Sequence, residues 1–269
     1  MKEKLEEILS RYADVFGYCE FSRVEKYLIK CRNIEKIPKN AKNIIVVLFP
    51  YYLGEEAYEN SNVSRYAVVP DYHTVANIYL EKMTEKLKNA FPGEEFMYFA
   101  DNSPIPEVTT ASAAGVGFIG RNGLLINEKY GSWVFIGEIV TTLDFLANSR
   151  ELTYCNGCGK CIEACPTGVL GDEIFDADKC LSCITQKKGE NIPDEYVELM
   201  KKYNCAWGCD QCQKACPYNV NARKTYIEEF NNGQIPNVTP GVDVYGRAFA
   251  WRGEKVINRN LELMNKEEL

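Results

Sequence analysis

The sequence predicts an α+β protein in two main parts, a domain of mixed helices and strands followed by a cysteine-rich domain. Apolar patterns typical of helices and of strands occupy roughly residues 1–150, and closely spaced cysteines replace them from about residue 150 onward. The chain has 269 residues, of which 46% are hydrophobic, so it can bury a core and is not of the disordered class.

The periodicity of apolar residues assigns the elements in chain order. Apolar residues at helical spacing predict helices over 3–16, 71–90, 105–114 and 255–265. Apolar runs predict strands over 44–49, 96–100, 124–126 and 133–141. The strand 44–49 is continuously apolar, so we expect both of its faces to be buried. We expect domains at 1–150 and 151–225, and a tail at 226–269 that packs back on the body.

Two cysteine runs dominate the second part of the chain. The first has the spacing C-x2-C-x2-C-x3-C-P, and the second has C-x2-C-x3-C-P. Thiolates are soft ligands, and in runs of this type the cysteine before proline ligates a second [4Fe-4S] cluster. The spacing predicts a first cluster on four thiolates: Cys155, Cys158, Cys161 and Cys216. It predicts a second cluster on three more: Cys165, Cys209 and Cys212.

The second cluster needs one more thiolate, which Cys180, Cys183 or Cys205 could supply. A zinc site is a weaker interpretation, because zinc rarely needs a four-cysteine run closed by proline. Disulfides are weaker still, because nothing else in the chain suggests export. Cysteine runs of this kind cannot stabilise themselves without metal, so we expect this domain to fold only when it is loaded.

Charge and hydropathy limit the partners and the location of the protein. The formal net charge of −7 argues against broad, nonspecific nucleic-acid binding, although it leaves room for a local basic groove. No apolar run approaches the length needed to cross a bilayer. The charged N-terminus has no apolar signal-peptide core. We therefore expect a cytoplasmic protein without a membrane partner, in a compartment where thiols stay reduced.

Residues 115–120 match the pattern G-x-G-x-x-G. A dinucleotide fingerprint needs a strand before this pattern and a helix after it, whereas here a predicted helix precedes it and Arg121-Asn122-Gly123 follows. We interpret these glycines as a turn, or as a place where the backbone passes close to something large and flat.

Several stretches, in this order, resemble the epoxyqueuosine reductase family, which comprises cobalamin-dependent iron–sulfur enzymes related to reductive dehalogenases. The matching stretches are Ser64-Arg65-Tyr66-Ala67 with Asp71-Tyr72-His73, Asp101-Asn102-Ser103-Pro104 with Glu107, 114–126, 131–139, both cysteine runs, and Trp251-Arg252-Gly253 with Arg259-Asn260. The resemblance covers roughly residues 40–260. The chain resembles a short, divergent member that lacks the C-terminal helical-repeat domain of many relatives.

The resemblance implies a nitroreductase-like cobalamin-binding domain followed by a bacterial-ferredoxin-like domain with two [4Fe-4S] clusters. Cys180 would complete the second cluster. Electrons from a low-potential donor such as ferredoxin or flavodoxin would pass through the clusters to cobalt. A monomeric enzyme would then convert epoxyqueuosine in tRNA to queuosine, a step of queuosine biosynthesis.

The resemblance also implies the roles of individual residues. Asp101 matches the family's proton donor, and desolvation in a pocket would raise its pKa enough for an acid. The alternative is an ordinary strand-end or helix-capping residue. His73, the only histidine, is interpreted as structural or near the corrin edge and not as a cobalt ligand. The implied cobalamin contacts are Tyr66, Asp101, Asn122, Leu125, Ser132, Gly137, Gln186 and Asp210.

Two other functions fit the same residues. The first is the same redox machinery acting on a small epoxide or halide, or on a corrinoid protein, because the family's arginine after the position of Glu107 is Val108 here. The second is a corrin-free electron carrier of the ferredoxin type. A cobalt absorption band after reconstitution would separate the second from the rest, and turnover of tRNA would separate the first from the leading hypothesis.

Overall fold

The computed structural model describes residues 1–171, 173–189 and 191–266. The chain divides into two compact units, one formed by Met1–Pro50 and His73–Gly157 and the other by Tyr51–Tyr72 and Cys158–Leu269. Residues 51–72 thus group with the cysteine-rich part, although most of the first unit follows them in the chain. The domain boundaries expected from the sequence do not provide for this excursion. The separate roles of 151–225 and 226–269 stay predictions.

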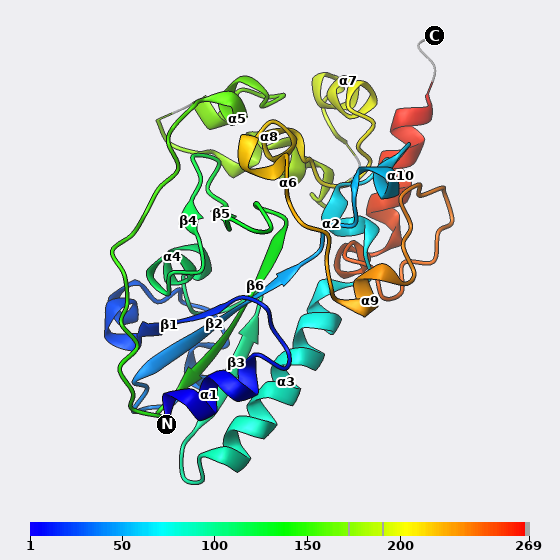
Figure 1. Cartoon of the computed structure of the whole chain (residues 1–269). Coiled ribbons are helices and arrows are strands. Elements are labelled where there is room, and N and C mark those ends of the chain that lie inside the picture. The colour runs from blue at the N-terminus through cyan, green and yellow to red at the C-terminus, as the bar shows by residue number, and fades with distance from the viewer. Residues whose placement is uncertain (172, 190, 267–269) are drawn as a thin grey trace. The chain divides into compact units, whose positions relative to one another are not determined.

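The first unit is built on a four-stranded antiparallel sheet in the order β1–β2–β6–β3 (Figure 1). Its strands are β1 (Phe16–Glu20), β2 (Asn43–Pro50), β3 (Phe96–Ala100) and β6 (Val134–Thr141). Every residue of the central strand β2 is buried, which confirms the prediction made from its continuous apolar run.

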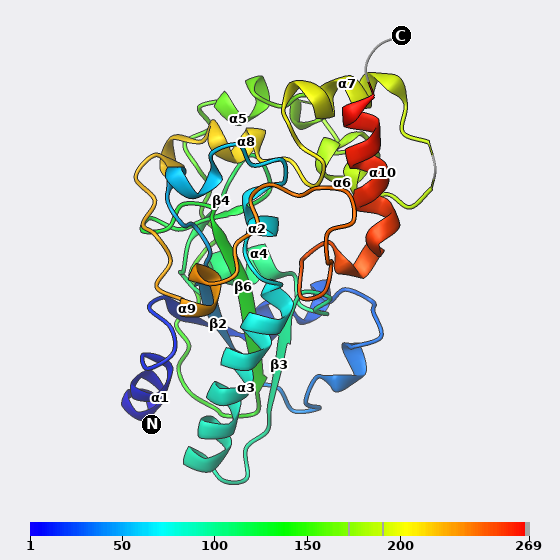
Figure 2. The ribbon, with the colours of Figure 1, turned by 90° about the vertical axis from the view of Figure 1, so that its right-hand side faces the viewer.

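Helices cover both faces of this sheet. The side chains of Ile44, Val46 and Leu48 on β2 belong to one buried cluster with Ala111 of α4 (Glu107–Ala113). Phe49 points to the other face, where its ring packs edge-on against Tyr79 of α3 (Tyr72–Ala90), with ring centres 6.0 Å apart. The alternation follows from the two-residue period of a strand. Figure 2 shows α3 lying along the sheet.

A short hairpin, formed by β4 (Phe118–Ile119) and β5 (Leu125–Ile126), adjoins α4 in the first unit. It contains the second half of the G-x-G-x-x-G pattern. A Cβ atom at Gly117 would lie 2.6 Å from the carbonyl oxygen of Ile126, so a glycine is needed for the two chain segments to approach. This arrangement agrees with the interpretation of the glycines as a turn.

The N-terminal helix α1 spans Lys2–Leu9, so the prediction of a helix over 3–16 was too long. Its last predicted residue, Phe16, begins the edge strand β1, which the sequence analysis missed. Pairing with β2 overrides the local helical pattern here. A Cβ at Gly17 would lie 2.2 Å from the carbonyl oxygen of Ala114, which explains the glycine in this strand.

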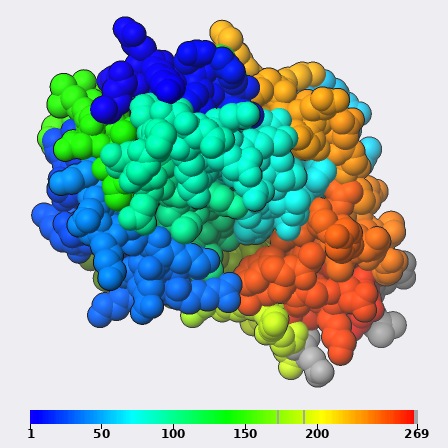
Figure 3. All heavy atoms as spheres, turned by 90° about the horizontal axis from the view of Figure 1, so that it is seen from below, coloured from blue at the N-terminus to red at the C-terminus, as the bar shows by residue number. Residues whose placement is uncertain are grey.

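Helices α1 and α3 lie side by side on the face shown in Figure 3. The Lys4 ammonium donates a hydrogen bond to the carbonyl oxygen of Ala90, at 2.9 Å. A surface pocket of about 250 Å³ is lined by residues of both helices, among them Ile8, Tyr12 and Lys86. None of the residues predicted to form the functional site lines this pocket.

The second unit consists of short helices joined by turns. They are α2 (Arg65–Val68), α5 (Lys160–Glu163), α6 (Leu181–Thr185), α7 (Asp194–Lys202), α8 (Gln211–Lys214), α9 (Glu228–Asn231) and α10 (Glu254–Asn265). Leu181, Ile184 and Met200 form a small core against which Leu263 of α10 packs. The prediction of a final helix over 255–265 is thus confirmed.

The described residues also form short 3-10 segments at Phe21–Arg23, Glu25–Tyr27, Ile34–Lys36, Glu55–Tyr58, Val169–Gly171, Ala177–Lys179, Pro217–Asn219 and Ala250–Arg252. The tail of the second unit is bonded to its N-terminal excursion. The Asn62 amide exchanges two hydrogen bonds with the backbone of Val238, each 2.8 Å long.

Among the described residues, no helix combines the length and the apolar character required to span a bilayer.

Gly137 on β6 tests the packing of the first unit. A Cβ atom there would lie 2.7 Å from the Phe49 ring and 3.0 Å from Leu80 of α3. We expect Gly137→Ala to lower the free energy of unfolding by about 1–3 kcal/mol through overpacking, measured by urea denaturation. The exposed Lys88→Ala on α3 is the control. Unchanged stability would show that packing does not require this glycine.

Candidate active site and cluster-binding region

Asp101 directly follows β3 and is part of a constrained loop. Asp101 and Asn102 both have positive φ angles, 56° and 43°, which residues other than glycine seldom adopt. The loop is held from outside, because the Asn33 amide donates to the carbonyl oxygen of Asn102 at 2.9 Å. The Ile29 N–H likewise donates to the carbonyl oxygen of Pro104 at 2.8 Å. Strain of this kind persists where the surroundings fix it, which is common at functional sites.

A half-buried glutamate, Glu107, and a fully buried one, Glu138, lie next to the Asp101 loop. Burial and the charge of Asp101 raise the pKa of Glu107 to about 7, against the opposing effects of the Asp101 N–H and the charge of His73. Burial raises the pKa of Glu138 well above its ordinary value, and Glu107 adds to this. The Ser103 hydroxyl opposes that shift by donating to Glu138 Oε2 at 2.5 Å. The protonated form of Glu138 is therefore favoured.

His73 also contacts Asp101, and unlike Glu138 it is partly exposed to solvent. Its Nε2 is 2.8 Å from Asp101 Oδ2, and the side chains are 33% and 54% exposed. His73 is the second residue of α3, so helix and strand bring together two residues that are 28 positions apart in the sequence. The sequence contained no signal for this pair. Whether His73 lies near a corrin edge stays a prediction.

Glu107 and Glu138 were not among the predicted site residues. One signal for them was present in the sequence, because Glu138 interrupts the apolar run of β6. Its side chain points to the same face of the sheet as those of Ile136 and Val140, which is the face that α4 covers. A glutamate at such a position is buried, so its carboxyl group must be paired or protonated.

The remaining predicted cofactor contacts of the first unit lie on and after the β4–β5 hairpin. Leu125 and Ser132 are buried. Asn122 Oδ1 accepts a hydrogen bond from the Leu124 N–H at 3.4 Å. Its Nδ2 is buried and has no hydrogen-bond partner among the residues that the structure describes. A buried amide donor of this kind fits a ligand with acceptor groups. Gly137 packs against Phe49 and Leu80 in the first unit.

The two cysteine runs have matching backbone geometry. In each run the cysteine before the last one lies in a one-turn helix, Cys161 in α5 and Cys212 in α8. The two helices contact each other. The cysteine before proline then donates its N–H to the carbonyl oxygen three residues earlier, at 3.1 Å for Cys165 and 3.0 Å for Cys216. The runs therefore present their thiols in equivalent ways.

Cys155 differs from the other cysteines of the first run. Its N–H donates to the carbonyl oxygen of Ile119 at 2.9 Å, and by its contacts the residue belongs to the first unit. Its grouping with Cys158, Cys161 and Cys216 in one cluster stays a prediction. All twelve cysteines lie among the described residues, and none of them forms a disulfide there. Within 1–171, 173–189 and 191–266, no three metal-ligating side chains are arranged to hold a single ion.

Three thiols expected to bind the second cluster are neighbours. Burial raises the pKa of Cys209 to about 11, and the charges of Cys180 and Cys165 contribute to the increase. A bound cluster would reverse this effect, because metal stabilises the thiolate form. The second unit thus brings together two cysteines of the runs and two of the three candidates for the missing ligand, Cys180 and Cys205.

Cys180 forms a hydrogen-bonded pair with Cys183. It directly precedes α6, and hydrogen bonds from the Cys183 thiol and from the N–H groups of Cys183 and Ser182 lower its pKa to about 6. The same pairing raises the pKa of Cys183. Burial raises the pKa of Cys205 to about 12. The assignment of Cys180 as the last ligand stays a prediction.

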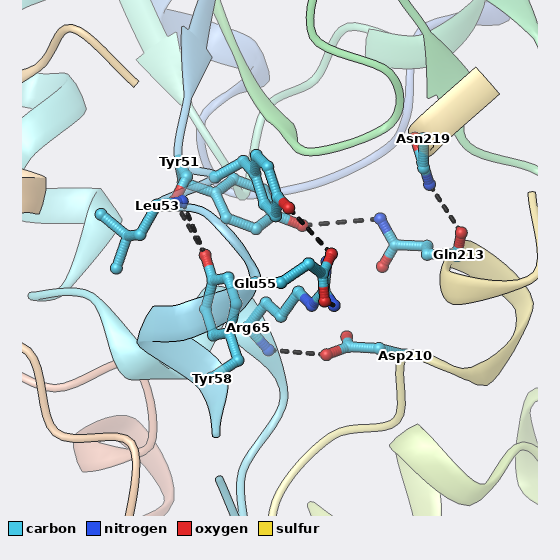
Figure 4. A network of polar contacts seen from close by, with 9 residues as sticks. Tyr51, Leu53, Glu55, Tyr58, Arg65, Asp210, Gln213 and Asn219 are labelled. Carbon is cyan, nitrogen blue, oxygen red and sulfur yellow. Dashed lines mark hydrogen bonds and ion pairs between the residues drawn. The ribbon is translucent and has the colours of Figure 1, made fainter. Parts of the chain in front are cut away.

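A buried polar network, shown in Figure 4, holds the second cysteine run. Asp210 directly follows Cys209, and its Oδ2 accepts a hydrogen bond from the Arg65 N–H at 2.7 Å. The Arg65 guanidinium pairs with Glu55 at 2.5 Å and lies 4.7 Å from the centre of the Tyr58 ring. These contacts explain why residues 51–72 group with the second unit.

The other predicted contacts of the second unit are also fixed in place. The Tyr66 hydroxyl accepts a hydrogen bond from Trp207 Nε1 at 2.8 Å, and burial raises its pKa, so it stays neutral. Gln186 turns back on α6 and donates to the carbonyl oxygen of Ser182 at 3.1 Å. Gly208, with φ of +74°, leaves room for Ser64, whose Oγ would be 2.1 Å from a Cβ there.

Asn260 of α10 connects two segments that flank cysteines. Its side chain is fully buried, and Nδ2 donates to the carbonyl oxygens of Thr185 and Ala206, both at 2.7 Å. The Arg259 guanidinium donates to Asn260 Oδ1. The family motif Arg259-Asn260 is therefore explained by its structural role near Cys183 and Cys205.

Two family models match the chain. Residues 32–102 match the model described as "Epoxyqueuosine reductase QueG, DUF1730", and residues 154–219 match the "4Fe-4S double cluster binding domain". An epoxyqueuosine reductase of Lactococcus garvieae is 34% identical over 243 residues, which cover 83% of this chain and 68% of the relative. One from Gloeobacter violaceus is 38% identical over 198 residues, which cover 72% of this chain and 61% of the relative.

Solved structures share the fold. The epoxyqueuosine reductase of Streptococcus thermophilus superposes with a TM-score of 0.80 at 24% identity, covering 98% of this chain and 80% of that chain. An epoxyqueuosine reductase crystallised with an epoxyqueuosine-modified tRNA-Tyr stem loop gives a TM-score of 0.79. At this identity the likeness establishes the fold.

The mixed α+β fold and the match over residues 154–219 define the class of the chain, a protein with a [4Fe-4S]-binding domain. The similarity to the Lactococcus garvieae relative, over 83% of the chain, defines it further. The chain belongs to the epoxyqueuosine reductase family, which confirms the resemblance of its motifs.

Asn260→Ala should destabilise the second unit. The substitution leaves two buried carbonyl oxygens without their donor, so we expect the free energy of unfolding to fall by about 2–4 kcal/mol. Urea denaturation of the iron-loaded protein measures this, and iron should be released at a lower urea concentration. Glu262→Ala, an exposed substitution on the same helix, should change neither value. Equal stability of the two variants would contradict the bridging role.

Glu107 should make stability depend on pH. The raised pKa means that the folded chain keeps a proton that the unfolded chain releases, so between pH 4.5 and about 7 the folded state binds more protons. The contribution of this group to the free energy of unfolding therefore falls as pH rises through that window. Glu107→Gln cannot ionise and should flatten the decline, as measured by urea denaturation against Glu128→Gln. An unchanged slope would contradict the assignment.

Proposed function

We propose that this chain reduces epoxyqueuosine in tRNA to queuosine. The observation that carries the proposal is the presence, in one chain of this family, of a cluster-binding domain and a constrained Asp101 next to Glu107 and Glu138, whose pKa values are raised. Named relatives are epoxyqueuosine reductases, and one related structure holds a modified tRNA-Tyr stem loop. A tRNA anticodon stem loop is therefore the proposed substrate.

Two [4Fe-4S] clusters are proposed as the electron path. Their ligands would be Cys155, Cys158, Cys161 and Cys216 for the first, and Cys165, Cys180, Cys209 and Cys212 for the second. The neighbouring thiols of Cys165, Cys180 and Cys209 support the second set. A low-potential donor such as ferredoxin or flavodoxin would supply the electrons.

Cobalamin is proposed as the second cofactor, because a cluster cycles one electron whereas the reduction of an epoxide needs two. When bound, cobalamin supplies a two-electron reductant at the substrate. The proposed contacts are Tyr66, Asp101, Asn122, Leu125, Ser132, Gly137, Gln186 and Asp210. The partnerless Asn122 Nδ2 supports a ligand with acceptor groups on the first unit. The first unit would then be nitroreductase-like, and the second would be bacterial-ferredoxin-like.

The catalytic role proposed for this chain's own residues centres on Asp101. Its carboxyl group would protonate the oxygen that leaves the substrate. His73 orients Asp101 through the 2.8 Å contact, and the loop geometry fixes its backbone. Negative charge on the neighbouring Glu107 would disfavour ionisation of Asp101, because like charges disfavour each other's charged form. The enzyme is proposed to act as a monomer in the cytoplasm.

Asp101→Ala tests the proposed function. We expect turnover of an epoxyqueuosine-containing tRNA stem loop to fall by at least about 10²-fold, because the acid is lost. Iron and cobalamin content should match the wild type. Asp144→Ala, an exposed aspartate of the first unit, should retain full turnover. A loaded wild-type chain that converts no stem loop would remove the substrate assignment, and an active Asp101→Ala would remove Asp101 from the mechanism.

The identity of the last cluster ligand is tested by two serine variants. Cys180→Ser should lose the second cluster and about half of the bound iron, because serine lacks a soft thiolate. Cys183→Ser should keep both clusters, although Cys183 is only three residues away. Iron and sulfide analysis with electron paramagnetic resonance measures both. The reverse pattern would assign Cys183 as the ligand instead.

A further inference from the structure

The proposed reaction consumes two protons. Two carbon–oxygen bonds of the epoxide break, a carbon–carbon double bond forms, and the oxygen leaves as water. The balance requires two electrons, which a low-potential one-electron donor supplies in two steps, and two protons. Asp101 carries one of these protons. This inference rests on the proposed function, and it concerns the source of the second proton.

Glu107 is placed to supply it. The backbone N–H of Asp101 donates a hydrogen bond to the Glu107 carboxyl group, so the two carboxyl-bearing residues are direct neighbours. Glu107 begins α4, and Asp101 is in the loop that precedes this helix. The positive φ angle of Asp101 is the conformation in which this contact is made. The strained loop therefore holds the acid against a second carboxyl group.

Glu138 lies behind Glu107 and completes a row of three carboxyl groups. Glu138 is fully buried, its Oε2 accepts from Ser103, and the two glutamates interact with each other. Oε1 of Glu107 and Oε1 of Glu138 are both buried without a hydrogen-bond partner among the described residues. A charged carboxylate would be costly at either place, so the row favours protonated groups.

We propose that Glu107 is the proton reservoir of the active site, which reprotonates Asp101 after its first proton transfer. His73 contacts the Asp101 carboxylate, and the Cys31 thiol contacts the carbonyl oxygen of the neighbouring Asn102 at 3.9 Å. His73 touches the exposed end of the row, so it is the entry for protons from solvent. Glu107 acts through Asp101 and is a positioning residue, not one that touches substrate.

The first measurement does not depend on activity. Carboxyl carbons of 13C-glutamate are followed by NMR in the cluster-loaded, oxidised wild-type chain as pH is varied. We expect two glutamates to remain protonated at about pH 6, well above the ordinary glutamate pKa of about 4.3. The signal missing in Glu107→Gln should titrate in the wild type near neutral pH, and the signal missing in Glu138→Gln should persist to higher pH. Ionisation of every glutamate by that pH in the wild type would overturn the proposal.

The second measurement is the pH dependence of turnover on the stem loop. Glu107→Gln preserves the shape of the side chain and its acceptor for the Asp101 N–H but cannot hold the second proton. We expect kcat to fall by about 10–10²-fold with KM unchanged, as for loss of an acid–base group. The alkaline limb of the pH–kcat profile should also move to a pH about one unit lower, because the negative charge of Glu107 no longer disfavours ionisation of Asp101. Glu128→Gln should match the wild type.

The outcomes separate this inference from the proposed function. Normal kcat and an unshifted pH profile in Glu107→Gln would overturn the reservoir while leaving epoxide reduction intact. If the glutamates are protonated but the chain converts no stem loop, the pairing of Asp101 with Glu107 would be supported and the substrate assignment would be wrong. If Glu107→Gln does not fold, the wild-type titration decides alone.

Discussion

The hydrogen bond from the Arg65 backbone to Asp210 is the interaction on which the second unit depends most. A cluster needs thiolates from separate segments, and none of the short helices that carry them has a core of its own. Asp210 follows Cys209 directly, so its anchoring sets the start of the second cysteine run. The Arg65 side chain is enclosed by Glu55 and Tyr58, and a buried charge is tolerated only when it is paired in this way.

The first unit relies on the opposite use of burial. Its sheet places Glu138 on the face covered by α4. Among the described residues, no positively charged group acts on the Glu138 carboxyl there. The protonated form of Glu138 is therefore favoured, and the pKa of its neighbour Glu107 is raised as well. One unit thus fixes charges to organise thiols, whereas the other excludes charge to keep protons available. Reductive removal of an oxygen needs both electrons and protons.

The sequence revealed what depends on local pattern and little of what depends on contacts across the chain. The buried strand β2, helix α3 and the [4Fe-4S]-binding domain were predicted from the sequence. Each has a residue spacing that is set by backbone geometry or by ligand chemistry. The strand β1 was missed, because its pairing with β2 outweighs a local helical pattern. The contact of His73 with Asp101 joins residues far apart in the chain and left no mark in the sequence.

The excursion of residues 51–72 into the second unit was likewise invisible in the sequence. The family motif around Arg65 implied a cofactor contact at Tyr66, and in the structure the backbone N–H of Arg65 bonds to Asp210 in the second cysteine run. Motif positions such as Asn260 have the same explanation, since its amide bridges two backbone segments. A residue shared with a family therefore need not touch the substrate or the cofactor.

We propose that one chain holds both the cluster path and the two-electron cofactor. Anaerobic reconstitution with iron, sulfide and cobalamin, followed by gel filtration and by spectra of what stays bound, tests this proposal. We expect corrin to remain on the chain, with a base-off Co(II) signal beside the cluster signal. Clusters without retained corrin would contradict it and would make the chain an electron carrier that shares only the family's scaffold.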